Sequence, residues 1–124
     1  MGAAPVVLLV DDDARVLSAL RRALRREAYD LEVAGNAARA LERLAIDPPI
    51  ALVISDYKMP GMNGIELLTR VRSRHPETAR ILLSGWACEI CASDREAAGL
   101  VALLAKPWDD GELKDSIRAA LPLV

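Results

Sequence analysis

Four short segments of the sequence are almost entirely apolar and lack the alternation of polar and apolar residues that marks a half-exposed strand. They are residues 6–10, 51–54, 81–83 and 101–104. Such runs are typical of strands buried on both faces of a parallel sheet. A weaker run at 31–34 indicates a fifth strand. Because both faces of such a sheet must be covered, helices are expected on either side.

Apolar residues at helical spacing occur between these strands. After the first strand, Val16, Leu17 and Leu20 recur on one face of a predicted helix. Its arginines are interpreted as a solvated face, with a docking patch as the alternative: Arg21, Arg22, Arg25 and Arg26. Further helices are predicted at 37–44, 65–71, 88–98 and 112–121. Strict alternation of strand and helix predicts a doubly wound α/β fold, with residues 1–124 forming a single domain.

Size and charge exclude several classes of partner. A chain of 124 residues can bury enough apolar surface to fold alone, and its net charge of −2 gives no reason to expect direct binding to nucleic acid or to an anionic membrane. No apolar run approaches the roughly 20 residues that a membrane span requires. The first residues also lack the charged and apolar regions of a signal peptide. A cytoplasmic location is therefore expected.

The only two cysteines, Cys88 and Cys91, form a C-x-x-C pattern. A zinc site would need two further ligands, and the chain offers only His75. A thioredoxin-like redox motif would follow an early strand and open a helix near the N-terminus. We therefore expect two ordinary thiols on one helix.

Polar residues follow four of the predicted strands, at the edge where open parallel sheets bind their ligands. They are Asp11, Asp12 and Asp13 after the first strand, Ser55 and Asp56 at the third, Ser84 and Gly85 at the fourth, and Lys106 at the fifth. Crowded carboxylates repel one another unless a proton or a cation compensates them. Magnesium is typically held by one or two carboxylates together with a phosphate. The pattern predicts an Mg²⁺ site at Asp12 and Asp56, with Asp11 in support.

Asp56 is the candidate nucleophile of this edge, because a carboxylate can attack phosphorus covalently. Lys106 would then neutralise a phosphoryl group on Asp56, and Ser84 would donate a hydrogen bond to it. Taken singly, Ser84 could be a strand-end hydroxyl and Lys106 a surface lysine. Asp13 is expected to be the N-cap of the first helix. The joint placement of these residues after separate buried strands favours the functional interpretation.

Four segments resemble the signature of response-regulator receiver domains in two-component signalling. They are Val-Asp-Asp-Asp at 10–13, Ser-Asp-Tyr-Lys-Met-Pro-Gly-Met-Asn-Gly at 55–64, Leu-Ser-Gly at 83–85 and Lys-Pro-Trp at 106–108. The resemblance implies a flavodoxin-like five-stranded parallel sheet with strand order 2-1-3-4-5. Segments 56–64 and 106–110 are most similar to receivers fused to HD-GYP cyclic-di-GMP phosphodiesterases or to hydrogenase-type transcriptional activators.

The same resemblance implies roles for individual residues. Asp56 would take the phosphoryl group from the phosphohistidine of a sensor histidine kinase or phosphotransfer protein. Asp11, Asp12, Asp56 and the main-chain carbonyl of Lys58 would hold Mg²⁺, with Ser84 as the switch hydroxyl and Lys106 as the lysine of the site. Such a protein is a signalling switch and not an enzyme, and its partners can include a fused or separate effector or a second copy.

One position departs from the family pattern, because Leu103 stands where receivers usually carry Tyr or Phe. We therefore expect phosphorylation to change the output surface, formed by the predicted helix at 88–98, strand at 101–104 and helix at 112–121, without an aromatic rotamer switch. Trp86, two residues beyond Ser84, is expected to shield the phosphorylated site from water.

Two alternatives remain. Asp11-x-Asp13 imitates the D-x-D nucleophile motif of haloacid-dehalogenase-type phosphatases, but Arg15 stands where that resemblance expects Thr or Val. A receiver-like interaction module that is never phosphorylated is the other alternative, and Leu103 is the residue that favours it. Nucleotide-binding glycine motifs are absent from the sequence.

Overall fold

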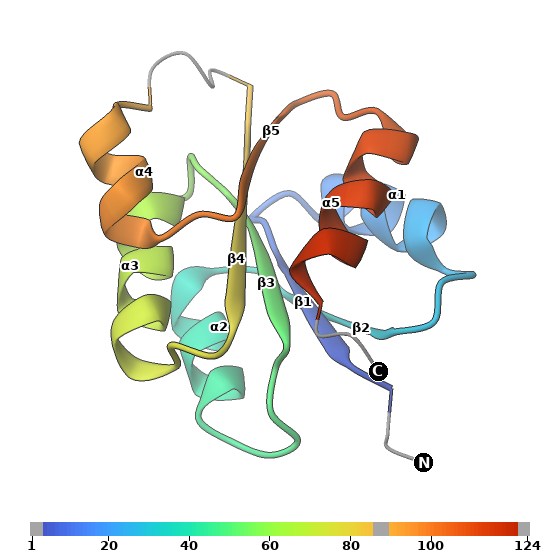
Figure 1. Cartoon of the computed structure of the whole chain (residues 1–124), viewed down its shortest axis with the longest axis horizontal. Coiled ribbons are helices and arrows are strands. Elements are labelled where there is room, and N and C mark those ends of the chain that lie inside the picture. The colour runs from blue at the N-terminus through green and yellow to red at the C-terminus, as the bar shows by residue number, and fades with distance from the viewer. Residues whose placement is uncertain (1–3, 86–89, 122–124) are drawn as a thin grey trace.

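A computed structural model of the chain describes residues 4–85 and 90–121 (Figure 1). Its strands are β1 (Val6–Val10), β2 (Asp30–Ala34), β3 (Leu52–Asp56), β4 (Ala79–Ser84) and β5 (Ala102–Ala105). They form one parallel sheet in the order β2-β1-β3-β4-β5. The predicted flavodoxin-like, doubly wound topology is confirmed.

Helices cover both faces of this sheet (Figure 1). They are α1 (Ala14–Leu24), α2 (Ala37–Leu44), α3 (Gly64–Arg74), α4 (Ala92–Ala98) and α5 (Asp110–Ala120). Side chains of α1 and α5 pack with one face of the sheet, and those of α2, α3 and α4 pack with the other. Two apolar clusters result, one on each side. Among the described residues, no helix is long and apolar enough to cross a lipid bilayer.

Burial explains why the strands differ in sequence. Every residue of β1 and β3 is buried, since these strands lie inside the sheet with helices on both faces. β2 lies at the edge, and only Ala34 of its five residues is buried. Its weak apolar pattern follows from that position.

The helix ends match their sequence signals in two cases. Asp13 is the N-cap of α1, as predicted, and its carboxylate accepts a hydrogen bond from the amide of Arg15. Asn63 and Glu66 form a reciprocal capping box at the start of α3. This box fixes where α3 begins, directly after the loop that follows Asp56.

Helix α4 is shorter than predicted, because it begins at Ala92 and not at residue 88. Cys91 lies directly before α4 with an extended backbone. It is an exposed, free cysteine. The expectation of two thiols on one helix is therefore wrong for Cys91. Cys88 and Trp86 lie outside the described residues.

Two arginine side chains hold the C-terminal end of α4. The guanidinium of Arg72 on α3 donates to the carbonyl oxygens of Glu96 and Ala97, at 2.6 and 3.2 Å. Arg80 on β4 donates to the carbonyl of Gly99, at 3.2 Å. Gly99 ends the helix in the left-handed conformation, with a φ of 60°. The last carbonyls of α4 are thus bonded to side chains of its neighbours in the fold.

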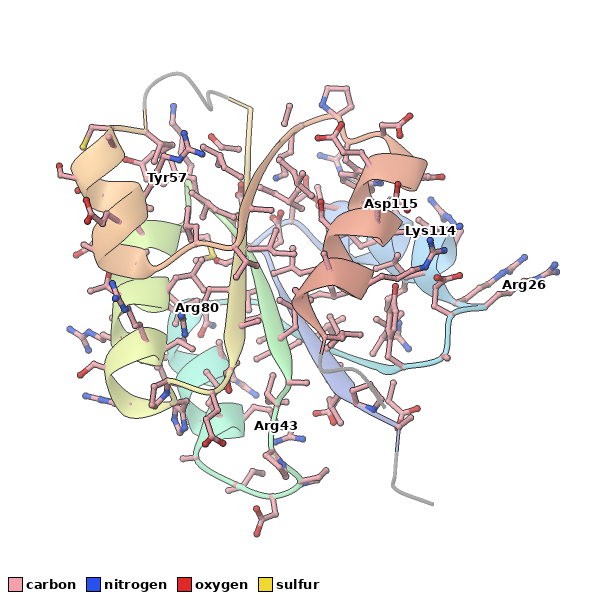
Figure 2. The ribbon with its side chains drawn as sticks, in the orientation of Figure 1. Arg26, Arg43, Tyr57, Arg80, Lys114 and Asp115 are labelled. Atoms are coloured by element: carbon pink, nitrogen blue, oxygen red, sulfur yellow. The ribbon has the colours of Figure 1, made fainter. Side chains whose placement is uncertain are left out.

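The arginines at the end of α1 lie on its exposed face. Arg21, Arg22, Arg25 and Arg26 are all exposed, as expected for a solvated helix face. Arg26 extends away from the body of the molecule (Figure 2).

Candidate functional site

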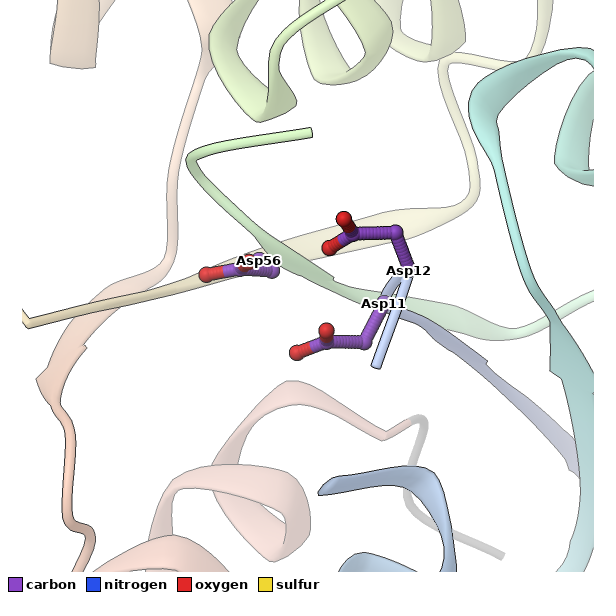
Figure 3. A group of neighbouring side chains, drawn as sticks. All are labelled: Asp11, Asp12 and Asp56. Atoms are coloured by element: carbon purple, nitrogen blue, oxygen red, sulfur yellow. The ribbon is translucent and has the colours of Figure 1, made fainter. Parts of the chain in front are cut away.

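Three carboxylates meet at the carboxyl edge of the sheet (Figure 3). Asp11 and Asp12 follow β1, and Asp56 is the last residue of β3, its neighbour in the sheet. One oxygen from each carboxylate lies within 4.8 Å of the others. The fold therefore brings together the acidic residues that the sequence singled out.

The two inner carboxylates are held by backbone amides. Asp11 is only 1% exposed and accepts a hydrogen bond from the amide of Asp13 at 2.9 Å. Asp56 is 8% exposed, and its Oδ1 accepts one from the amide of Tyr57 at 2.9 Å. Asp12 is exposed. A ligand that approaches from solvent would thus meet Asp12 at the surface and Asp56 behind it.

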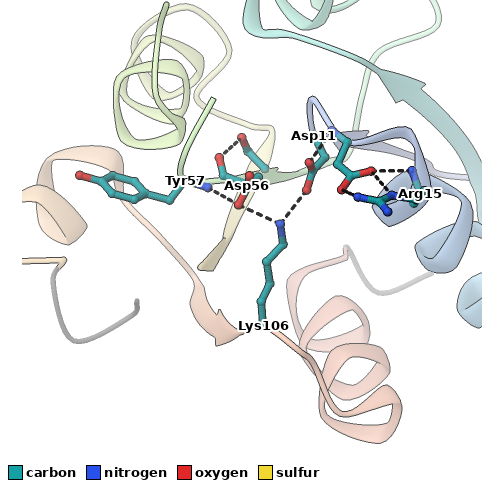
Figure 4. Close-up of polar contacts among 7 residues, drawn as sticks. Asp11, Arg15, Asp56, Tyr57 and Lys106 are labelled. Atoms are coloured by element: carbon teal, nitrogen blue, oxygen red, sulfur yellow. Dashed lines mark hydrogen bonds and ion pairs between the residues drawn. The ribbon is translucent and has the colours of Figure 1, made fainter. Parts of the chain in front are cut away.

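Lys106 bridges the two buried carboxylates (Figure 4). Its Nζ lies 2.9 Å from Oδ2 of Asp11 and 3.1 Å from Oδ1 of Asp56. The backbone amide of Lys106 donates to the carbonyl of Ser84 at 3.0 Å, which ties the end of β5 to the end of β4. Ser84 is itself only 2% exposed. The side chains predicted to form the site thus all come from the carboxyl ends of β1, β3, β4 and β5, which are adjacent in the sheet.

Burial and charge shift the pKa values of this site. Burial raises the pKa of Asp56, and the nearby charge of Asp11 adds to that effect, while the hydrogen bond from Lys106 opposes it. For Lys106, burial alone would lower the pKa, but hydrogen bonds to Asp11 and Asp56 outweigh it and raise the value. Lys106 therefore stays protonated at neutral pH. One ammonium faces three carboxylates, so the site carries excess negative charge.

The donor set suits a hard divalent cation. Carboxylate oxygens are the ligands that Mg²⁺ prefers, and it binds few of them while keeping several waters. Burial is the main cause of the raised pKa of Asp56, and a cation next to Asp12 would offset the charge of Asp11 that adds to it. Lys58, whose carbonyl is predicted to complete the metal shell, has an exposed side chain. That role of its carbonyl stays a prediction.

Gly64 contributes to the site in a way that sequence analysis did not identify. Its amide donates to the carbonyl of Tyr57 at 2.8 Å. A Cβ at this position would overlap the carbonyl oxygen of Asp56 and lie 2.7 Å from Cδ1 of Leu82. Only glycine lets α3 start this close to the backbone of Asp56. The sequence signal for this role was the glycine that ends the segment at 55–64 and stands at the start of α3.

Comparison with known proteins agrees with this geometry. The sequence model of the response regulator receiver domain family matches residues 7–118 of this chain. The chain belongs to the response-regulator receiver domain family. This receiver is 40% identical over 117 residues to the hydrogenase transcriptional regulatory protein HoxA of Cupriavidus necator, covering 93% of the chain and 24% of HoxA. The chain thus spans about a quarter of that relative.

Two further relatives are similar over nearly their whole length. The sporulation initiation phosphotransferase F of Bacillus subtilis is 30% identical over 117 residues, which cover 94% of each protein. The crystal structure of a signal receiver domain of an HD domain-containing protein from Pseudomonas fluorescens Pf-5 superposes with a TM-score of 0.90. It is 37% identical, with 98% of this receiver and 89% of that chain covered.

The family assignment removes the phosphatase alternative. Asp13, the second residue of the apparent D-x-D motif, caps α1 and pairs with Arg15, so its carboxylate is already engaged. The receiver is therefore a two-component signalling domain with an acidic pocket suited to a divalent metal.

Proposed function

We propose that Asp56 is the phosphoacceptor of this receiver and that residues 1–124 act as one phosphorylation-controlled switch. The observation that carries the proposal is the position of Lys106, whose Nζ lies 3.1 Å from Oδ1 of Asp56. Asp56 is thus the carboxylate that faces both the ammonium and the other two acidic residues. The donor would be the phosphohistidine of a sensor histidine kinase or of a phosphotransfer protein.

The chemistry follows from the contacts of Asp56. Its Oδ1 is engaged by Lys106 and by the amide of Tyr57, which leaves Oδ2 to attack phosphorus. The new O–P bond forms as the P–N bond to the donor imidazole breaks, and the imidazole leaves with the bonding electron pair and takes up a proton. Mg²⁺ held by Asp11, Asp12, Asp56 and the carbonyl of Lys58 would neutralise charge on the transferring phosphoryl oxygens. Lys106 would neutralise the same charge from the other side.

Other proteins would then recognise the phosphorylated state of this domain. Ser84, at the end of β4, would donate its hydroxyl to the phosphoryl group and draw the start of the following loop with it. HoxA is named a transcriptional regulatory protein and is about four times longer than the matched segment. By analogy, this domain would pass its state to an effector, fused or separate, or to a second copy. It would act in the cytoplasm, as a switch and not as an enzyme, without touching nucleic acid directly.

Incubation with Mg²⁺ and a small phosphodonor, followed by intact mass measurement, tests the proposal. We expect one phosphoryl group on the wild type and none on Asp56→Asn. Asp30→Asn, which removes an exposed carboxylate outside the site, is the matched control and should be labelled like the wild type.

Other outcomes point to other functions. Labelling that persists in Asp56→Asn and disappears in Asp11→Asn would mean that the nucleophile is misassigned. No labelling of the wild type, by the phosphodonor or by a phosphorylated histidine kinase, would favour an interaction module that is never phosphorylated.

A further inference from the structure

Tyr57 connects the proposed phosphoacceptor with the helix side of the sheet. Its amide is shared between Oδ1 of Asp56, at 2.9 Å, and the carbonyl of Leu83, at 3.0 Å. Its carbonyl accepts the amide of Gly64, the first residue of α3. The backbone of Tyr57 is therefore fixed to the carboxylate on one side and to a helix start on the other.

The ring of Tyr57 lies away from the carboxylates. It is half-buried and packs against the apolar cluster formed by β1, β3, β4 and helices α2, α3 and α4. Buried Ile90, directly before α4, belongs to this cluster, and Leu103 of β5 packs against it. Figure 4 shows the ring directed away from Lys106, and Figure 2 shows Tyr57 on the side of the sheet that carries α4. Tyr57 thus contacts Asp56 through its amide and the apolar cluster beneath α4 through its ring.

The two ends of α4 are held differently. Its C-terminal end is bonded to Arg72 and Arg80 through three backbone carbonyls. At its N-terminal end, the side chain of Cys91 gives no capping hydrogen bond. A helix without a capping bond from its own N-cap residue is less strongly fixed at that end. A force applied near Ile90 would therefore tilt α4 about its arginine-bound end.

We propose that Tyr57 couples the chemical state of Asp56 to the position of the N-terminal end of α4. The inference rests on the proposed function. When Oδ2 becomes the ester oxygen of an acyl phosphate, Oδ1 becomes a neutral carbonyl oxygen and accepts a weaker hydrogen bond from the Tyr57 amide. The amide can then turn towards Leu83, its second acceptor, and the ring moves with it. Interiors are close-packed, so a displaced ring requires its neighbours beneath α4 to repack.

Beryllofluoride, a non-covalent mimic of the phosphoryl group, provides the test together with Mg²⁺. Binding is first measured by titration for the wild type, Tyr57→Leu and Tyr57→Phe. Amide hydrogen exchange is then compared with and without the ligand. We expect all three proteins to bind. The exchange response of α4 should be retained in Tyr57→Phe, which keeps the ring, and at least halved in Tyr57→Leu.

Three results of this experiment would contradict the coupling role of the Tyr57 ring or the function on which it rests. A full α4 response in Tyr57→Leu would overturn the coupling role of the ring, and so would its loss in Tyr57→Phe. Unchanged exchange in α3 and α4 of the ligand-free variants shows that the packing beneath α4 is intact, so a lost α4 response to the ligand is a lost coupling. Failure of the wild type to bind beryllofluoride would instead overturn the proposed function, and this inference with it.

Discussion

Lys106 Nζ lies 3.1 Å from Oδ1 of Asp56, so the end of β5 delivers a positive charge directly to the end of β3. The same ammonium contacts Asp11, and it is the single cation paired with these carboxylates among the described residues. The pKa of Asp56 stays raised, because burial and the charge of Asp11 outweigh the opposing hydrogen bond from Lys106. The site is thus prepared for additional positive charge, and its stability should depend on pH and on metal.

Asp56→Asn should stabilise the metal-free protein. The pKa of Asp56 is raised in the folded state, so the folded state favours the protonated carboxyl. That contribution to stability is present below the unfolded-state pKa and is lost as pH rises through the folded-state pKa. At pH 7 the ionised group is unfavourable, and Asn should raise the free energy of unfolding by about 1 kcal/mol. Urea denaturation at pH 7 measures this gain, which should shrink at pH 4; an unchanged or lower stability at pH 7 would contradict it.

Asp12→Ala should weaken Mg²⁺ binding at least tenfold (about 1.4 kcal/mol). Asp12 is the exposed member of the three carboxylates, and Mg²⁺ is held by few protein ligands, so the loss of one matters. Isothermal titration without phosphate measures the affinity, with Asp30→Asn as the control for general loss of negative charge. Equal affinity in Asp12→Ala and the control would show that the metal assignment is wrong.

Gly64→Ala should destabilise the fold and weaken the metal site together. The added methyl group overlaps the backbone carbonyl of Asp56, so α3 or the end of β3 must shift. We expect a loss of about 2–3 kcal/mol in the free energy of unfolding. Gly35→Ala is the matched control, because a Cβ there meets no atom within 4 Å. Equal effects at the two glycines, measured by denaturation and by Mg²⁺ titration, would contradict the close-approach argument.

Leu103→Tyr should enlarge the response of α4 and β5 to beryllofluoride. Leucine can pack against the cluster in either state with little difference in energy, so it biases the equilibrium weakly. A ring with a polar tip would differ more between the two states. Amide chemical shifts with and without beryllofluoride measure the response. If the wild type already shows a full change and Leu103→Tyr adds nothing, the missing aromatic is irrelevant.

Tyr29→Phe should leave stability unchanged or raise it by up to about 1 kcal/mol. The hydroxyl of Tyr29 is buried without a hydrogen-bond partner among the described residues, and burial raises its pKa to about 12. Removing it deletes an unsatisfied polar group while the ring stays in place. Thermal unfolding at pH 7 checks this, and a clear loss of stability would mean that the hydroxyl has a partner, such as a bound water.

Sequence patterns predicted the sheet well, because a strand that is buried on both faces consists of consecutive apolar residues. β1 was expected at 6–10 and occupies Val6–Val10. β5 was expected at 101–104 but occupies Ala102–Ala105, and the exposed Val101 precedes the strand. The acidic residues were predictable for a related reason: the carboxyl ends of parallel strands meet at one edge, so residues far apart in sequence must meet there.

Contacts between elements were not predictable in the same way. The extended backbone at Cys91, which delays the start of α4, has no clear sequence signal. The bonds from Arg72 and Arg80 to the end of α4 depend on how α3, β4 and α4 pack, since an arginine pattern alone predicts only a solvated face. The overlap between Gly64 and Asp56 likewise exists only once α3 is docked on the sheet.

The two apolar clusters share no residue, because consecutive side chains of each strand point to opposite faces. Val53 packs towards α2, α3 and α4, while Ile54, the next residue of β3, packs towards α1 and α5. The hydrogen-bonded sheet is thus a stiff partition between two half-cores. Side chains of one half-core can therefore repack without displacing side chains of the other, so a change beneath α4 can leave the packing of α1 and α5 on the sheet intact.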